Sequence, residues 1–155
     1  GSIPETTPGT DLAASVIGQG RIEVSPLSMA VAAGSMARGA FLAPTLVKVG
    51  AGATTPAPAA LPQPALDQTR ALMRSVVTEG SGTALQGAPG GEVFGKTGTA
   101  EYGTEVPPKT RAWFVGYQGD LAFAVLVEDG RSGGSVAAPI ARSFLDLYRA
   151  APTAE

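Results

Sequence analysis

Three strand-like segments follow one another between residues 92 and 128, and this succession restricts the fold more than any other feature of the chain. Only a Gln-Gly-Asp tripeptide separates the second segment from the third. Such a short turn pairs its flanking strands antiparallel. The third segment, Leu-Ala-Phe-Ala-Val-Leu-Val-Glu, is apolar up to its last residue, which predicts a central strand buried on both faces. The expected strands cover about 92–102, 111–117 and 121–128.

Three helical segments flank these strands. Ser25 can cap a helix that Pro26 opens, because the amide hydrogen that a proline lacks has no partner at the first helical position. Gly39 tolerates the left-handed conformation that ends a helix. A second amphipathic segment stops at Gly80, and Pro139 opens a third. The expected helices cover about 26–38, 66–79 and 139–149.

Shorter elements surround this framework. Asp11 can cap a short helix that runs through Val16, and a single helical turn is expected around 83–86. The apolar stretch 41–49 reads as a short strand, which Pro44 would place at a sheet edge. Helices combined with a three-strand antiparallel sheet define an α+β fold.

The stretch 50–64 is an uncharged tract of Ala, Pro and Thr. Prolines deprive it of the amide donors that a strand ladder or a helix needs, so we interpret it as a surface loop within one domain. That domain is expected to span residues 3–150. The leading Gly1-Ser2 resembles the remnant of a purification tag.

Composition excludes several classes of function. The chain has 11 Lys and Arg against 13 Asp and Glu, so it lacks the basic surface of a nucleic-acid-binding protein. It contains no Cys and no His, which removes disulfides, thiolate metal sites and any catalytic triad that depends on histidine. Its longest apolar run is far shorter than a membrane span. We expect no cofactor and no metal.

Residues 90–97 match the spacing Gly-x-x-x-x-Gly-Lys-Thr of a phosphate-binding loop. Such a loop must follow a buried strand and open a helix, whose amides hold the phosphates. Here small and polar residues precede the glycine, and poor helix formers follow Thr97. The context therefore argues against nucleotide binding.

The same residues offer a second interpretation. On a strand, Thr97 and Thr99 share one face, so their hydroxyls would point together toward one acceptor. Gly98 would let a ligand backbone approach closely, and Lys96 adds a positive charge. Together they describe a site for a peptide-like ligand with a carboxylate, with strand amides available to an oxyanion. A solvated lysine beside two ordinary strand threonines is the alternative.

The sequence Lys96-Thr97-Gly98-Thr99-Ala100, followed by Ala-Trp-Phe-Val-Gly-Tyr at 112–117, resembles the third motif region of the penicillin-binding proteins, the cell-wall transpeptidases. The resemblance covers about 16–148 and is strongest to the monofunctional, class B enzymes. Further stretches match this family in the same order: 17–20, 25–30, 44–47, 76–84 and 138–141.

The resemblance implies a role for each residue of the motif. Lys96 would stabilise the bound carboxylate and support proton transfer near the nucleophile. Thr97 and Thr99 would bind the terminal carboxylate of a D-Ala-D-Ala stem peptide or of a β-lactam. The Thr99 amide would supply half of the oxyanion hole, and Gly98 would permit close approach. Trp113 and Phe114, on the next strand, are expected in the core.

The chain departs from the family in its nucleophile. The family uses a serine three residues before a lysine, and later a Ser-x-Asn motif. Here Thr45, Val93 and Val106 precede the three lysines at that spacing, and the sequence contains no Asn. Both motifs lie upstream in the family's order. The chain therefore resembles the C-terminal portion of a transpeptidase domain, inactive alone.

The resemblance also sets expectations for structure and location. The family's sheet has five strands, so two would be contributed by an upstream segment. We expect the exposed edge to be covered by that segment, by self-association or by strand exchange. The parent protein would act on the extracytoplasmic face of the membrane. Alternatives are a related β-lactamase, carboxypeptidase or β-lactam sensor, and a non-catalytic peptide-binding module.

Overall fold

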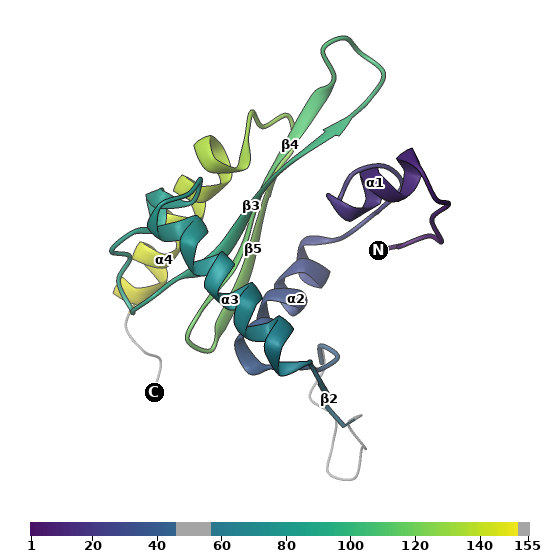
Figure 1. Ribbon diagram of the computed structural model, residues 1–155. Helices are drawn as coiled ribbons and strands as arrows, with labels where there is room; N and C mark the ends of the chain where they lie inside the picture. The colour runs from purple at the N-terminus through teal and green to yellow at the C-terminus, as the bar shows by residue number, and fades with distance from the viewer. Residues whose placement is uncertain (46–56, 152–155) are drawn as a thin grey trace.

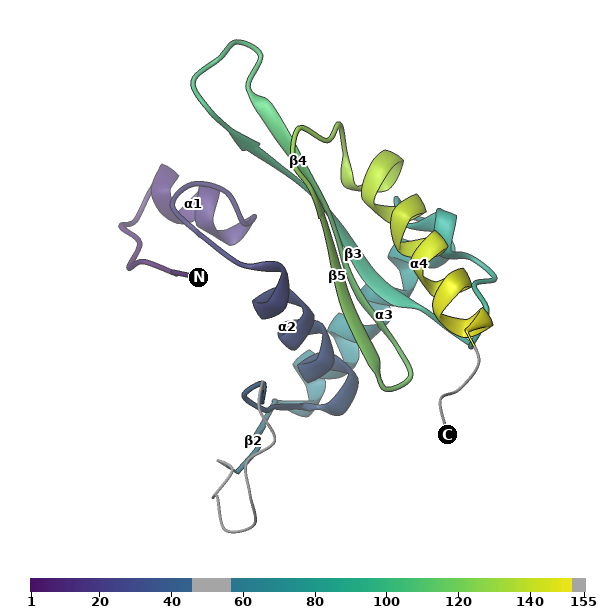
Figure 2. The ribbon, with the colours of Figure 1, turned by 180° about the vertical axis from the view of Figure 1, so that it is seen from behind.

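The computed structural model describes residues 1–45 and 57–151, and its centre is an antiparallel sheet in the order β3-β4-β5. The view in Figure 2 shows this sheet nearly edge-on, with α4 on one side and α2 on the other. In Figure 1, α3 crosses beside β3, and α1 stands apart near the upper end of the sheet.

The strands are β1 (Ala40–Phe41), β2 (Ala59–Ala60), β3 (Phe94–Tyr102), β4 (Lys109–Gln118) and β5 (Leu121–Val127). The helices are α1 (Thr10–Val16), α2 (Pro26–Arg38), α3 (Gln63–Thr78) and α4 (Ala138–Ala150), with a 3₁₀ turn η1 (Thr83–Leu85) and a π-helical turn η2 (Gly133–Ala137).

Strand register divides the sheet into two chemically different faces. Gly98 lies opposite Trp113 of β4, which lies opposite Leu126 of β5. This row faces α2. Thr97 lies opposite Phe114, and their row faces η2 and α4, because side chains alternate along each strand.

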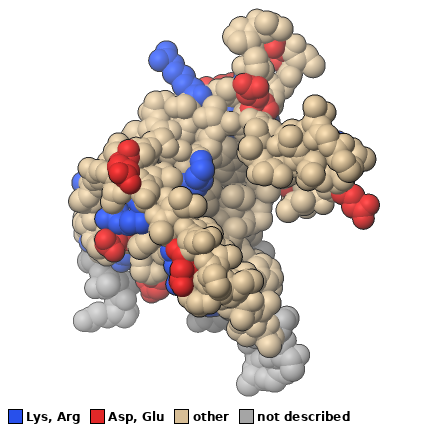
Figure 3. All heavy atoms as spheres, in the orientation of Figure 1, with Lys and Arg blue, Asp and Glu red and all other residues tan. Residues whose placement is uncertain are grey.

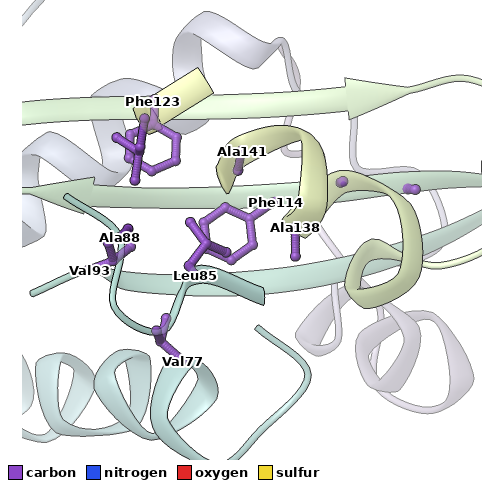
Figure 4. Packing of buried hydrophobic residues seen from close by; sticks show 11 residues of the cluster. Val77, Leu85, Ala88, Val93, Phe114, Phe123, Ala138 and Ala141 are labelled. Carbon is purple, nitrogen blue, oxygen red and sulfur yellow. The ribbon is translucent and has the colours of Figure 1, made fainter. Parts of the chain in front are cut away.

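The hydrophobic core lies between the sheet and α4. Phe114 is fully buried at its centre and stacks on Phe123, with ring centroids 6.0 Å apart (Figure 4). Small side chains of α4 let the helix approach the sheet closely. The buried members of the core are Val77, Leu85, Ala88, Val93, Ala112, Phe114, Phe123, Ala137, Ala138, Ala141 and Leu145.

Helix α2 begins and ends where its capping residues predict. Ser25 and Ser28 form a reciprocal capping box, and Gly39 adopts a left-handed conformation with φ 81°. Two of the last carbonyl oxygens of α2 find hydrogen-bond donors in α3: Arg70 donates 2.7 Å hydrogen bonds to the carbonyl oxygens of Met36 and Ala37. Arg70 therefore fixes α3 against α2 beside the sheet.

Several expected boundaries differ from the structure. Helix α3 begins at Gln63, so the expected loop 50–64 contains β2 and the first helical residues; its first part, 50–56, lies outside the described residues. Of the expected strand 41–49, only Phe41 lies in a strand, at the end of β1, while 42–45 form none and 46–49 lie outside the described residues. Asp11 does not cap α1: the N-cap is Gly9, and the Asp11 carboxylate accepts hydrogen bonds from Thr7 and Arg21 instead.

The third strand is not the central one. In this sheet β4 is central, and most β5 side chains are only partly buried. The apolar composition of β5 indicates burial of its faces. Whether a strand is central is a separate matter, because it depends on whether another strand pairs with each of its edges. In the described part of the chain, nothing pairs with that edge.

Gln118 belongs to β4 rather than to the turn. Its side chain is fully buried, and its amide nitrogen donates to the carbonyl oxygens of Pro89 and Gly91 at 2.8 and 3.0 Å. Its amide oxygen accepts a hydrogen bond from Arg149 of α4 at 3.0 Å. Gln118 thus fixes the loop that leads into β3, where the predicted site residues lie.

Candidate functional site

A hollow of about 1010 Å³ lies between α2 and the sheet. Residues 96–100 of β3 form one wall, and Trp113 of β4 continues it. Met29 and Met36 of α2 form the apolar opposite wall. Charged side chains of both signs are scattered over the face shown in Figure 3, so charge is not concentrated as on a nucleic-acid-binding surface.

Lys96 lies on the hollow side of β3. Its ammonium group donates a 2.5 Å hydrogen bond to the carbonyl oxygen of Thr97, and its side chain is exposed. Lys96 takes part in none of the five ion pairs among the described residues. Its charge is therefore available to an anion that enters the hollow.

Gly98 is packed against Trp113. A Cβ atom at Gly98 would lie 3.2 Å from the Cβ of Trp113, so a larger residue would crowd the β4 side chain. Phe114 is in the core as expected, whereas Trp113 is half-buried and lines the hollow. The expectation for Trp113 was wrong because alternation along β4 puts the two aromatic residues on opposite faces.

Thr97 and Thr99 share the other face of β3, as their spacing predicts. The Thr97 side chain is buried, and its hydroxyl lies 2.5 Å from the hydroxyl of Ser81. The Thr99 hydroxyl is exposed and accepts a weak hydrogen bond from the amide of Gly133 at 3.4 Å. Lys96 points to the opposite side, so the predicted residues flank the strand from both faces.

The outer edge of β3 carries backbone groups that β4 does not use. The side chain of Gln19 donates a 3.3 Å hydrogen bond to the carbonyl oxygen of Thr99, which shows that this carbonyl points away from β4. In an antiparallel pair, the N–H and C=O of one residue point to the same side. The Thr99 amide therefore also faces the outer edge, where an oxyanion or a peptide could meet it.

Two glycines of η2 pack closely against neighbouring backbone, Gly133 against β3 and Gly134 against Ser81. A Cβ atom at Gly133 would lie 2.6 Å from the carbonyl oxygen and 2.7 Å from the amide nitrogen of Gly98. A Cβ atom at Gly134 would lie 2.7 Å from the carbonyl oxygen of Ser81. Only glycine fits at these points, so η2 fixes the position of both β3 and Ser81.

Replacing Gly133 by alanine is expected to lower the free energy of unfolding by about 1–3 kcal/mol, because the new methyl group meets backbone that must shift. Urea unfolding measures the change. Gly34→Ala is the matched control: it adds a methyl group inside α2, at an ordinary 3.4 Å from Ala122, and should be neutral or stabilising. Equal stability of the two variants would contradict this packing.

The far end of β3 is held by a polar cluster. The Tyr102 hydroxyl donates a short hydrogen bond to the Asp129 carboxylate, and the Arg111 guanidinium lies 3.8 Å from the centroid of the Tyr102 ring. The hydrogen bond to Asp129 favours the neutral phenol and raises the pKa of Tyr102. The neutral Tyr102 side chain thus helps to hold the loop end of the β3–β4 hairpin.

The structure gives the phosphate-loop pattern a different context. Lys96 and Thr97 lie within β3 and do not open a helix. Over residues 1–45 and 57–151, no cluster of three or more His, Cys, Asp or Glu side chains is arranged to hold a metal ion. Within the same ranges, no helix is both long enough and apolar enough to cross a membrane.

Sequence reasoning assigned no role to Gln19, Ser81 or Gly133. Gln19 and Ser81 lie in stretches that resemble the family, but their contacts join residues 80 and 16 positions apart in the chain. Only the Gly-Gly pair at 133–134 was a local signal, since adjacent glycines often mark a close approach of backbone.

The family model of the penicillin-binding protein transpeptidase domain matches residues 3–146. Peptidoglycan D,D-transpeptidase PbpA of Mycolicibacterium smegmatis is 35% identical over 167 residues, which cover 90% of this chain and 33% of that protein. PbpA of Mycobacterium tuberculosis is 40% identical over 70 residues, or 37% of this chain and 14% of that one. The chain thus spans a third or less of the curated relatives it matches.

Solved structures agree with this match. Pseudomonas aeruginosa PBP2 in complex with WCK 5153 gives a TM-score of 0.70 at 27% identity, covering 88% of this chain and 33% of that one. The imipenem acyl-enzyme of penicillin-binding protein A from M. tuberculosis gives a TM-score of 0.62 at 29% identity, covering 90% of this chain and 35% of that one. A peptidoglycan synthase complex gives a TM-score of 0.72 at 25% identity, covering 96% of this chain and 28% of that one. The chain belongs to the family of penicillin-binding protein transpeptidase domains.

Proposed function

We propose that this chain forms the carboxylate- and oxyanion-binding wall of a serine acyltransferase that cross-links peptidoglycan stem peptides. The observation that carries the proposal is the outer edge of β3. There the Thr99 amide and carbonyl point away from β4, Lys96 lies on one side, and the Thr97 and Thr99 hydroxyls lie on the other.

A peptide ligand would bind this edge as an added strand. Its backbone would use the outward amide and carbonyl of Thr99, which is the way extended peptides join exposed sheet edges. Its terminal carboxylate would accept hydrogen bonds from the Thr97 and Thr99 hydroxyls. The positive charge of Lys96 would strengthen carboxylate binding through the local field, at the rim of a hollow with apolar walls.

The reaction follows from what this edge can stabilise. A serine hydroxyl attacks the carbonyl carbon of the penultimate D-Ala. The carbonyl oxygen of that residue becomes an oxyanion, which accepts a hydrogen bond from the Thr99 amide. The carbon–nitrogen bond then breaks, terminal D-Ala leaves with a proton, and an ester to the serine remains. An acceptor amine attacks that ester and regenerates the serine. A β-lactam would enter the same first step and stay as the ester.

The nucleophile would come from residues outside this chain. At the required spacing before the three lysines stand Thr45, Val93 and Val106, so no Ser-x-x-Lys is present. Ser-x-Asn is likewise missing, because the sequence has no Asn. We therefore expect this chain to be inactive alone and to complete a domain that begins upstream.

The unpaired outer edge of β5 is a second reason to propose that a further segment completes the sheet. Its apolar sequence suits a strand with neighbours on both sides, yet nothing in the described residues pairs with its outer edge. An upstream segment of the same polypeptide would cover it, or a second copy would do so in its absence. The domain comprises residues 3–150 and would work on the extracytoplasmic side, where wall peptides are joined. One similar structure is a peptidoglycan synthase complex, which supports assembly with other envelope proteins.

Fluorescent penicillin tests the proposal. The complete polypeptide should become covalently labelled, and an excess of unlabelled penicillin should abolish the signal. A complete polypeptide that resists labelling would favour a non-catalytic peptide-binding module. Rapid loss of the label with release of opened penicillin would favour a β-lactamase.

A further inference from the structure

Ser81 touches the predicted carboxylate site from a different part of the chain. It lies between α3 and η1, 16 residues before Thr97, and the two hydroxyl oxygens are 2.5 Å apart. Ser81 is exposed, whereas Thr97 is only 8% exposed. Ser81 thus joins the solvent-exposed segment after α3 to the buried threonine of β3.

The backbone around Ser81 is firmly fixed. The amides of Glu79 and Gly80 both donate to the carbonyl oxygen of Ser75 at 3.0 Å, and the amide of Gly82 donates to the carbonyl oxygen of Val76 at 2.8 Å. Gly134 of η2 packs on the other side of Ser81. Because the segment is held from α3 and from η2, its hydroxyl is preorganised rather than carried by a loose loop.

Proton counting leaves two possible directions for this contact, with different consequences for a ligand. Each hydroxyl has one proton, so only one of the two can donate across the 2.5 Å contact. If Thr97 donates to Ser81, it has no proton left for a ligand. If Ser81 donates to Thr97, the Thr97 proton is free to point at a carboxylate, and the two hydrogen bonds strengthen each other.

Thr99 shows the same arrangement with its direction fixed. Its hydroxyl oxygen accepts from the amide of Gly133, a group that can only donate. The Thr99 proton is therefore free for a ligand. If Ser81 donates to Thr97, both threonine hydroxyls accept one hydrogen bond from the protein and each keeps its own proton for a ligand.

We propose that Ser81 is a positioning residue for carboxylate recognition, because its hydroxyl donates to Thr97 and turns the Thr97 proton toward the ligand. This inference rests on the proposed function and adds a residue to it. It specifies that Ser81 acts only when the ligand carries an anionic carboxylate beside the reacting carbonyl. Nothing in the role requires Ser81 to contact the reacting atoms.

Acylation kinetics of the complete transpeptidase test this role with two ligands. Benzylpenicillin carries the carboxylate, and its methyl ester does not. We expect Ser81→Ala to reduce the second-order acylation rate constant about tenfold with benzylpenicillin, as for loss of a charge-linked hydrogen bond, and less than twofold with the ester. Ser81→Thr keeps the hydroxyl and should restore the rate with benzylpenicillin to within about twofold.

Ser143→Ala is the matched control, because Ser143 is an exposed serine of α4 whose hydroxyl bonds only its own helix, at the carbonyl of Pro139. It should leave both rates unchanged. An Ser81→Ala variant that slows both ligands equally, or neither, would overturn the positioning role while labelling of the wild type still upholds the proposed function. A wild type that benzylpenicillin does not acylate would overturn the proposed function itself.

Discussion

Replacing Lys96 by methionine is expected to slow acylation of the complete transpeptidase by benzylpenicillin about 100- to 1000-fold. The ammonium group is the positive charge on the hollow side of the strand that carries the Thr99 amide, and loss of one preorganised electrostatic group at such a site has an effect of this size. Methionine keeps an unbranched side chain of similar length, so packing changes little. Stopped-flow measurement of the acylation rate constant gives the result.

Lys109→Met is the matched control for this variant. Lys109 is also an exposed lysine of the sheet, but it begins β4 and lies 3.9 Å from the Asp129 carboxylate, at the far end of the hairpin. Its replacement should change acylation less than about twofold, since an exposed ion pair contributes little. Acylation of the Lys96 variant at the wild-type rate would show that this charge has no part in the reaction.

Truncating Phe114 to alanine is expected to lower the free energy of unfolding by about 3–5 kcal/mol. The ring is fully buried, stacks on Phe123 and lies against Gly95 and Gly116, which have no side chains to fill the space. Phe114 is also the cross-strand partner of Thr97, so its loss should loosen the threonine that we propose binds the carboxylate. Denaturant unfolding of the complete domain measures the stability.

Leu72→Ala provides the comparison for Phe114. Leu72 is a large apolar residue of α3 but is 69% exposed, so its truncation should cost no more than about 0.5 kcal/mol. If the two variants lose similar stability, then the packing of the sheet against α4 is not the main source of stability in this chain.

Elements with local signals could be predicted from the sequence. Helix α2 has its capping serine, its first-turn proline and a terminal glycine, and its expected bounds match the structure. The turn after Gln118 is two residues long, with Gly119 at φ 60°, and the flanking strands pair antiparallel as expected. In both places the residues that decide the structure lie within a few positions of each other.

Features that depend on distant neighbours could not be predicted in this way. The apolar sequence of β5 indicates burial, but which strand is central depends on what pairs with each edge. In the sequence Gln118 looks like a turn residue. It is buried at the end of β4 because its side chain forms hydrogen bonds with the loop before β3 and with Arg149 of α4. No local sequence pattern predicts such long-range contacts.

The site itself divides in the same manner. The shared face of Thr97 and Thr99 follows from the two-residue repeat of a strand, so sequence sufficed. The Ser81 hydroxyl and the Gly133 amide behind them come from segments 16 and 34 residues away, and only the fold brings them together. The family resemblance proposes roles for Lys96, Thr97 and Thr99, and the structure adds the contacts that hold these residues in place.

Mapping the covalent penicillin adduct tests the central claim most directly. The complete polypeptide and the isolated 155-residue chain are each treated with benzylpenicillin, digested and analysed by mass spectrometry. We predict an adduct on a serine outside this sequence in the complete polypeptide, and no adduct on the isolated chain. An adduct on any serine within these 155 residues would contradict the account, because the nucleophile would then lie in the chain that we assign to the binding wall.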